Sequence, residues 1–173
     1  MERRSFFKAA GGLCGLLWLL VTHSLSFGEG FPKAGKDDRC PVCGMFVHKY
    51  PKWAAGFVFQ SGARYFHCCP KCMLHNLHQV SKYQPGETSE NIRQIWVTEY
   101  YTTKQTEARE VFFVVSTNLV GPMGLDLIPV RGKAAAENLK RDYDGELILS
   151  LDQITPDEIS KARSGRLKRK SDL

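Results

Sequence analysis

Two short cysteine-rich segments constrain this chain more strongly than any other feature. The first is Cys40-Pro41-Val42-Cys43-Gly44-Met45, and the second is His67-Cys68-Cys69-Pro70-Lys71-Cys72-Met73. Cysteine thiolates bind metal ions or pair as disulfides, so these segments are candidates for a metal centre or a redox site. Metal binding and disulfide pairing require different sets of thiols to lie close together in the fold.

One interpretation is a zinc site. Cys40, Cys43, Cys69 and Cys72 have the paired C-x2-C spacing of a closed structural zinc site. The chain would then hold Zn²⁺ and serve as a structural interaction module or a metal-sensing module. This interpretation leaves Cys68 without a purpose, and it gives no role to the methionines that accompany the cysteines.

Methionine thioethers indicate a different metal. Met45 ends the first segment, and Met123 lies in Gly121-Pro122-Met123-Gly124, where the flanking glycine and proline favour an exposed turn. Soft thiolate and thioether donors together select Cu(I), whereas methionine is a poor ligand for zinc. Met73, on the face of a predicted helix, is expected in the hydrophobic core instead.

A third interpretation is thiol-disulfide exchange by one of the C-x2-C pairs, although Cys40 lacks the strand-to-helix context of thioredoxin-like sites. Histidines add further donors. His75 and His78 are three residues apart and therefore share one face of a predicted helix, while His48 lies on the predicted first strand near Cys43. The residue pattern alone leaves these chemistries open.

The predicted elements run in the order strand, strand, helix, strand, and this order occurs twice. In the first half, we expect strands over 45–60, around Tyr65-Phe66 and over 92–101, and a helix over 70–83. In the second half, we expect strands over 111–116, 125–130 and 146–151, and a helix over 133–143. The sequence therefore predicts an α+β fold of two similar small ββαβ units, at 40–103 and 104–154. Because neither unit could bury an adequate core alone, they should pack together or be held by metal.

The charge is concentrated at the two ends of the chain. Of the 24 Lys and Arg and the 18 Asp and Glu, residues 9–160 contain 15 and 16, so the body is nearly neutral. A basic nucleic-acid-binding face is therefore not expected. Residues 155–173 should begin as a short helix capped near Thr155 and end as a basic tail.

Residues 1–26 have the three-part pattern of an export signal, with a basic start, an apolar run over 9–22 and small residues before Phe27. Arg3-Arg4 resembles a twin-arginine motif, with an ordinary export signal as the alternative. We therefore expect a periplasmic protein with a polar linker at 27–39, and membrane tethering through the N-terminus if the signal is not cleaved. Cys14 lies within the apolar run, where lipidation is not expected.

Taken together, the motifs resemble the NosL family, the extracytoplasmic copper chaperones for nitrous oxide reductase. The resemblance covers about residues 39–154. Its carriers are Cys40-Pro41-Val42-Cys43-Gly44-Met45 followed by Trp53, Ile95-Trp96-Val97-Thr98-Glu99-Tyr100 with Ala108-Arg109, and Gly121-Pro122-Met123-Gly124-Leu125-Asp126-Leu127-Ile128-Pro129. The first half is also similar to the YHS and TRASH metal-binding modules. The family is understood to fold as two similar ββαβ units, in agreement with the predicted element order.

The resemblance implies a ligand set. Cu(I) would be bound by Cys43, Met45 and Met123, with Cys40 as a further candidate, and the site would lie where the two units face each other. Such a partly exposed sulfur site of low coordination number would allow release of copper by ligand exchange.

The chain departs from the family pattern in its additional cysteines. Cys68, Cys69 and Cys72, together with His67, are candidates for a second metal site or a disulfide. The function implied by the resemblance is delivery of Cu(I) in the periplasm to a cupro-enzyme, nitrous oxide reductase or its maturation complex. Because the sequence contains no set of nucleophile, base and orienting residue, an enzyme is not expected.

Overall fold

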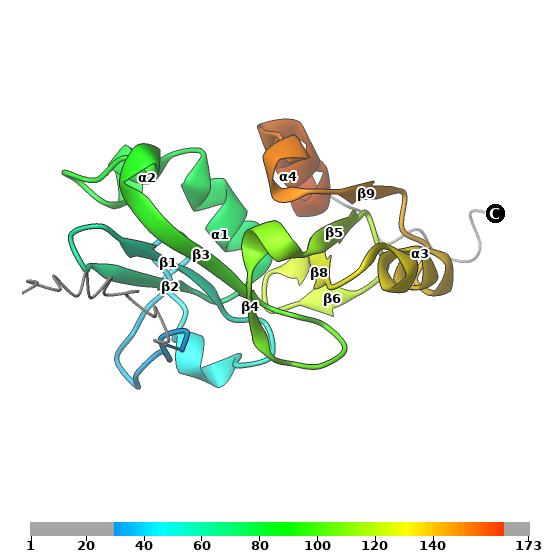
Figure 1. The fold of residues 1–173 in the computed structure, drawn as a ribbon, viewed down its shortest axis with the longest axis horizontal. Coiled ribbons are helices and arrows are strands. Elements are labelled where there is room, and N and C mark those ends of the chain that lie inside the picture. Colours follow the sequence, from blue (N-terminus) through cyan, green and yellow to red (C-terminus); the bar gives the residue numbers. More distant parts are fainter. Residues whose placement is uncertain (1–29, 165–173) are drawn as a thin grey trace, which may run out of the picture.

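Two antiparallel sheets lie along the long axis of the molecule, each with a helix packed against it (Figure 1). The computed structural model describes residues 30–164. The predicted export signal at 1–26 and the predicted basic tail after residue 164 lie outside the described residues. Within 30–164, no helix has the length and hydropathy needed to cross a membrane.

The first sheet has four strands in the order β2-β1-β3-β4. They are β1 (Ala55–Phe59), β2 (Arg64–His67), β3 (Ile92–Thr98) and β4 (Gln105–Glu107). The helices α1 (Pro70–Leu77) and α2 (Val80–Tyr83) connect β2 to β3. Pro70 occupies the first turn of α1, where the absence of its N–H costs no hydrogen bond, so the strand-to-helix junction falls directly on the second cysteine segment.

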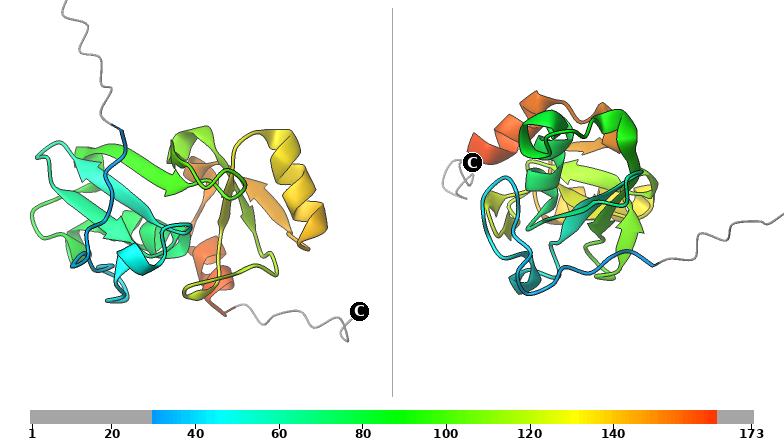
Figure 2. Two further views of the ribbon diagram at one scale, coloured as in Figure 1. Left: turned by 90° about the horizontal axis from the view of Figure 1, so that it is seen from below. Right: turned by 90° about the vertical axis from the view of Figure 1, so that its left-hand side faces the viewer.

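The second sheet has three strands in the order β8-β5-β9. They are β5 (Phe112–Val115), β8 (Ile128–Val130) and β9 (Leu147–Leu149), and α3 (Lys133–Asp142) packs on all three. A small hairpin of β6 (Val120–Gly121) and β7 (Gly124–Leu125) is inserted between β5 and β8. Finally, α4 (Pro156–Ser164) turns back onto α1 of the first unit (Figure 2).

The two units have the same topology. In each, the first strand is central, the second pairs with it on one side, and the strand that follows the helix pairs with it antiparallel on the other. The structure therefore confirms the predicted α+β class and the repeated ββαβ order, with β4 and the β6–β7 hairpin as additions.

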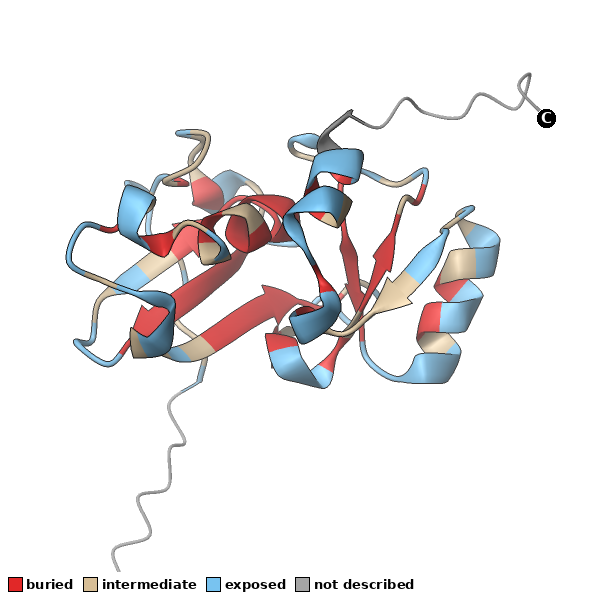
Figure 3. Ribbon diagram, turned by 90° about the horizontal axis from the view of Figure 1, so that it is seen from above, coloured by how far each residue is buried: buried red, intermediate tan, exposed pale blue. Residues whose placement is uncertain are grey.

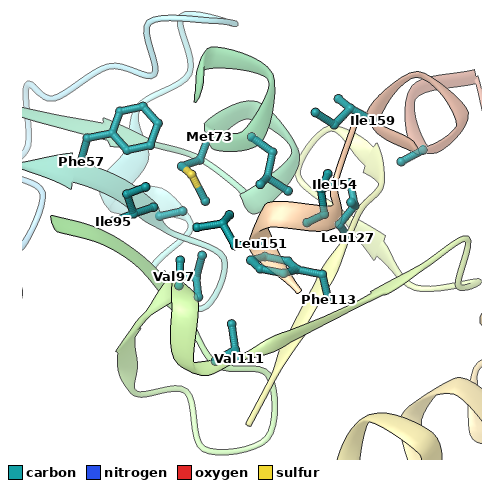
Figure 4. Packing of buried hydrophobic residues seen from close by; sticks show 14 of the residues in the cluster. Phe57, Met73, Ile95, Val97, Val111, Phe113, Leu127, Leu151, Ile154 and Ile159 are labelled. Atoms are coloured by element: carbon teal, nitrogen blue, oxygen red, sulfur yellow. The ribbon is translucent and has the colours of Figure 1, made fainter. Parts of the chain in front are cut away.

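One hydrophobic core is shared between the units (Figure 4). Phe57 and Met73 of the first unit pack in the same cluster as Phe113 and Leu127 of the second, and Ile159 of α4 joins them. Figure 3 shows that the burial concentrates where the units face each other. Sharing a core solves the problem that two units of this size cannot bury enough apolar surface separately. The core position expected for Met73 is confirmed.

Three predicted elements differ from the observed ones. The segment before β1 is not a strand but contains a short 3-10 helix at Val47–Lys49, so His48 does not lie on the first strand. The predicted helix over 70–83 is interrupted at Gln79, whose φ of −143° and ψ of 39° are not helical. The predicted strand over 125–130 is divided because Asp126 and Leu127 turn inward between β7 and β8.

Candidate metal centre

Four cysteine sulfurs converge at one end of the first sheet. The Sγ atoms of Cys40, Cys43, Cys68 and Cys72 all lie within 4.8 Å of one another. We refer to these four residues as the cysteine cluster. Cys40, Cys68 and Cys72 are buried, whereas Cys43 is partly exposed. None of these thiols is in a disulfide. Cys43 is therefore the member of the cluster most open to ligands from outside.

The first pair of sulfurs is held by a tight turn. The N–H of Cys40 donates to the carbonyl of Met45 at 2.9 Å, and the N–H of Gly44 donates to the carbonyl of Cys40 at 2.8 Å. Gly44 has a φ of +77°, in the left-handed region that glycine adopts without steric cost. The backbone N–H of Met45 also donates to the sulfur of Cys43. The turn thus directs two thiols to one side before any metal is bound.

The second pair comes from the junction of β2 and α1. Cys68 follows the last strand residue, and Cys72 lies in the first turn of α1, with 3.8 Å between the two sulfurs. Cys68 and Cys43 are closer still, at 3.4 Å. Successive residues of extended backbone point to opposite sides, and Cys69 is extended, with a φ of −162° and a ψ of 161°.

The structure groups four sulfurs differently from the zinc site predicted from spacing. Cys68, rather than Cys69, completes the group of four. Cys69 lies next to the cluster, with its sulfur 3.9 Å from that of Cys68, and it also lies beside the carboxylate of Asp126.

Cys43 lines two pockets, and each of them is also lined by a methionine. It lines a pocket of about 190 Å³ together with Cys72, His75 and Met123, and a second pocket of about 330 Å³ with Met45. Met123, at the turn of the β6–β7 hairpin, is 42% exposed. Burial raises the pKa of the Cys43 thiol to about 12, because its thiolate would lose hydration. A metal cation bound in either pocket would stabilise the negative charge of the thiolate in place of the lost hydration.

The hairpin that carries Met123 is fastened to the first unit by Lys71. This lysine is buried, and its Nζ donates to the carbonyl oxygens of Met123, at 2.8 Å, and of Leu125. A longer contact of 3.5 Å reaches the carbonyl of Ala162 in α4. We call this set of hydrogen bonds the Lys71 latch. It was not foreseen from the sequence, because lysine is rarely buried and no local pattern marks one that is.

Asp126, in the segment after the β6–β7 hairpin, forms a second hydrogen-bonded contact with Lys71. Its Oδ1 accepts the backbone N–H of Lys71 at 2.7 Å and that of Leu127 at 2.9 Å. The carboxylate is fully buried at the N-terminus of α1, where the free N–H groups and the helix dipole favour an anion. Burial nevertheless raises its pKa to about 6. Like Lys71, Asp126 was missed as a residue that positions the site.

The four histidines within residues 30–164 occupy different environments. His67 is fully buried, its Nε2 accepts a hydrogen bond from Asn76 at 2.8 Å, and burial lowers its pKa to about 4. His48 is exposed beside Phe46. The structure therefore brings neither ring into the cysteine cluster.

His75 and His78 diverge despite their helical spacing. The Nε2 of His78 donates to the carbonyl of Ile154 at 3.0 Å, away from the sulfurs. His75 lines the pocket that contains Cys43 and Met123, with its Nε2 at 3.1 Å from the hydroxyl of Tyr83. Of the histidines in the described part of the chain, His75 is thus the one beside the sulfur donors.

Comparisons with known proteins identify the family and the fold. The family model of NosL matches residues 32–159. A crystal structure described as the copper chaperone NosL from Shewanella denitrificans aligns with a TM-score of 0.57 and 20% sequence identity, covering 73% of this chain and 96% of that chain. At this identity the likeness shows a common fold. No match is found among curated proteins.

Proposed function

Because the chain belongs to the NosL family, we propose that it is a Cu(I) chaperone that binds the ion on Cys43 and on the thioethers of Met45 and Met123. The observation that carries the proposal is the position of Cys43, which lines one pocket with Met123 and another with Met45. Thiolate and thioether sulfur are the soft donors that Cu(I) prefers. Cys40 is the nearest further thiol of the same segment.

The exposure of this copper position suits transfer. A chaperone must hold Cu(I) against loss and then release it to stronger or more numerous ligands. Met123 is 42% exposed on a hairpin, and Cys43 is the partly exposed member of the cysteine cluster. An incoming ligand can therefore approach the ion before the chaperone ligands leave, so that copper passes by ligand exchange. Binding and exchange require no catalytic residues, so the proposed role is not enzymatic.

We propose a periplasmic location and nitrous oxide reductase, or its maturation complex, as the recipient. The support is the pattern of an export signal at residues 1–26 and the resemblance of the motifs to NosL chaperones. An uncleaved signal would tether the protein to the membrane. To test this choice of recipient, the copper-loaded chaperone is mixed with metal-free nitrous oxide reductase. Optical spectroscopy of the reductase then shows whether copper has been transferred to it.

The copper position predicts the effect of removing the thioethers. Replacing Met45 and Met123 together by leucine keeps similar volume but removes both soft donors, so Cu(I) should bind at least about tenfold more weakly, a loss of about 1.4 kcal/mol. Competition with a chromogenic Cu(I) chelator under anaerobic, reducing conditions measures this. Met73→Leu is the matched control, because it removes a buried core thioether and should leave copper affinity unchanged. Equal affinity in the double variant and the wild type would refute the proposed ligand set.

A further inference from the structure

We infer that the cysteine cluster is a second metal site, a closed tetrathiolate site for Zn²⁺ that lies beneath the copper position. The inference rests on the arrangement of Cys40, Cys43, Cys68 and Cys72 and does not require that copper bind at all. It also differs in composition from the zinc site that spacing suggested, because Cys68 takes the place of Cys69.

The sulfur positions have the dimensions of a tetrahedral zinc site. Zinc–sulfur bonds of about 2.3 Å in a tetrahedron place neighbouring sulfurs about 3.8 Å apart. The sulfurs of Cys68 and Cys72 are 3.8 Å apart, those of Cys43 and Cys68 are 3.4 Å apart, and no pair among the four exceeds 4.8 Å. A zinc ion therefore fits if each sulfur moves by about half an ångström or less.

The backbone around the first pair is already arranged for bound thiolates. The turn from Cys40 to Met45 is closed by two backbone hydrogen bonds and by the positive φ of Gly44. The N–H of Met45 donates to the sulfur of Cys43, which is the contact that stabilises negative charge on a ligand thiolate. Because the turn is already ordered, metal binding costs less conformational entropy.

The donor set and its burial favour zinc over copper at this position. Four thiolates with no open coordination position form the closed tetrahedral arrangement of structural zinc sites. Three of the four sulfurs belong to buried residues, so an incoming ligand could not readily displace them. A closed site of this kind holds its ion and is poorly suited to transfer, whereas the two thioethers beside Cys43 remain outside it.

Zinc would have a structural task at this place. Residues 30–54 contain little regular structure beyond the bridge between Arg39 and Phe46 and the short 3-10 helix at Val47–Lys49. They pack on the cysteine face of the first sheet in a small cluster separate from the main core. A metal joining Cys40 and Cys43 to Cys68 and Cys72 would anchor this loop to the β2–α1 junction. Cys43 would then contribute its sulfur to both ions.

The zinc content of two neighbouring variants tests the inference. Elemental analysis of protein purified without chelators should give about one zinc per chain for the wild type, and Cys68→Ser should lose it. Cys69→Ser is the matched control. Cys69 is equally buried and its sulfur is 3.9 Å from that of Cys68, but it is not one of the four sulfurs that all lie within 4.8 Å of one another, so this variant should keep the ion. Zinc retained in Cys68→Ser, or lost equally in both variants, would overturn the site as assigned.

A measurement on the wild-type chain keeps the inference testable if Cys68→Ser does not fold. Replacing zinc by Co²⁺ should give the intense sulfur-to-cobalt charge-transfer bands and the visible d–d bands of tetrahedral thiolate coordination. Weak octahedral bands, or a purified protein that contains only copper, would overturn the inference.

The copper proposal and the zinc proposal can be refuted independently of each other. In the variant with Met45 and Met123 replaced by leucine, copper affinity should fall while the zinc content stays at one per chain. Zinc lost together with copper in this variant would show that a single mixed site exists. A wild-type chain that binds zinc but no copper would refute the proposed function and leave the tetrathiolate site intact.

Discussion

Asp126 places a buried carboxylate between the two units. It accepts backbone N–H groups from Lys71 and Leu127, so it caps the helix that carries Cys72 while belonging to the segment that carries Met123. Desolvation raises its pKa from 3.8 to about 6, and the Cys69 thiol, the charge of Lys71 and the two N–H donors only partly offset that effect. At a pH between these two pKa values, Asp126 is mostly protonated in the folded protein and mostly ionised in the unfolded chain.

This difference in proton binding gives a pH dependence of definite sign. Because the folded state binds more protons between about pH 4 and pH 6, the contribution of Asp126 to the free energy of unfolding should fall as pH rises through that window, by roughly 2–4 kcal/mol. Asp126→Asn removes the titration. Urea unfolding of the metal-free, reduced wild type and variant at several pH values measures the difference between them.

The comparison between the two proteins isolates Asp126 from other groups. His67, with a pKa lowered to about 4, titrates in the same range with the opposite sign, since its stabilising effect is lost as pH falls. It is present in both proteins, so its effect cancels in the difference. Parallel stability curves for wild type and Asp126→Asn would show that Asp126 does not titrate with folding.

At the scale of elements, β1 separates the main core from the cysteine face. Phe57 and Phe59 point into the main core, while Gly56 faces the indole of Trp96. Trp96 in turn packs with Phe66 and with the buried cysteines. The absence of a side chain at Gly56 is what lets the indole lie flat against the strand beneath the metal centre.

Gly56→Ala should therefore disturb both the sheet and the metal centre. The added Cβ would lie 2.6 Å from the carbonyl oxygen of Tyr65 and 2.7 Å from the ring of Trp96, so the strand or the indole must move. We expect a loss of about 1–3 kcal/mol in the free energy of unfolding and a changed tryptophan emission spectrum. Gly30→Ala, where the new Cβ meets nothing within 4 Å, is the control. A variant as stable as wild type, with unchanged emission, would contradict this packing argument.

The elements that could be predicted from sequence are those whose signal is local. Apolar and β-branched runs located β1, β3 and β5, and helical periodicity with glycine before it located α3. The segment 45–54 was expected as a strand because it is apolar and aromatic. Its Val47 is instead buried through the Cys40 turn and the 3-10 helix, so tertiary packing explains the hydrophobic residues. The helix break at Gln79 could not be predicted, because neither glycine nor proline occurs near it in the sequence.

On the scale of the whole molecule, the candidate site depends on how the two units pack. The motifs identified Cys43 and Met123, but only the fold brings them to one pocket, by placing the β6–β7 hairpin against Lys71 at the start of α1. Whether Cys68 or Cys69 joins Cys40 and Cys43 depends on how the β2–α1 junction packs against the first cysteine segment, which spacing cannot reveal. Lys71 could not be found at all from sequence, because its role consists of hydrogen bonds to residues that are distant in the chain.

The Lys71 latch should couple the packing of the units to copper affinity. Lys71→Leu keeps an apolar stem but leaves the carbonyl groups of Met123 and Leu125 without their buried donor, so the free energy of unfolding should fall by roughly 2–4 kcal/mol. The hairpin would loosen, and Cu(I) should bind about tenfold more weakly because Met123 is no longer held beside the thiolate, whereas zinc content should not change. Lys82→Leu, at an exposed lysine of α2, should change neither quantity. Chelator competition and urea unfolding measure the two effects, and a destabilised Lys71→Leu variant with wild-type copper affinity would show that the lysine supports the fold alone.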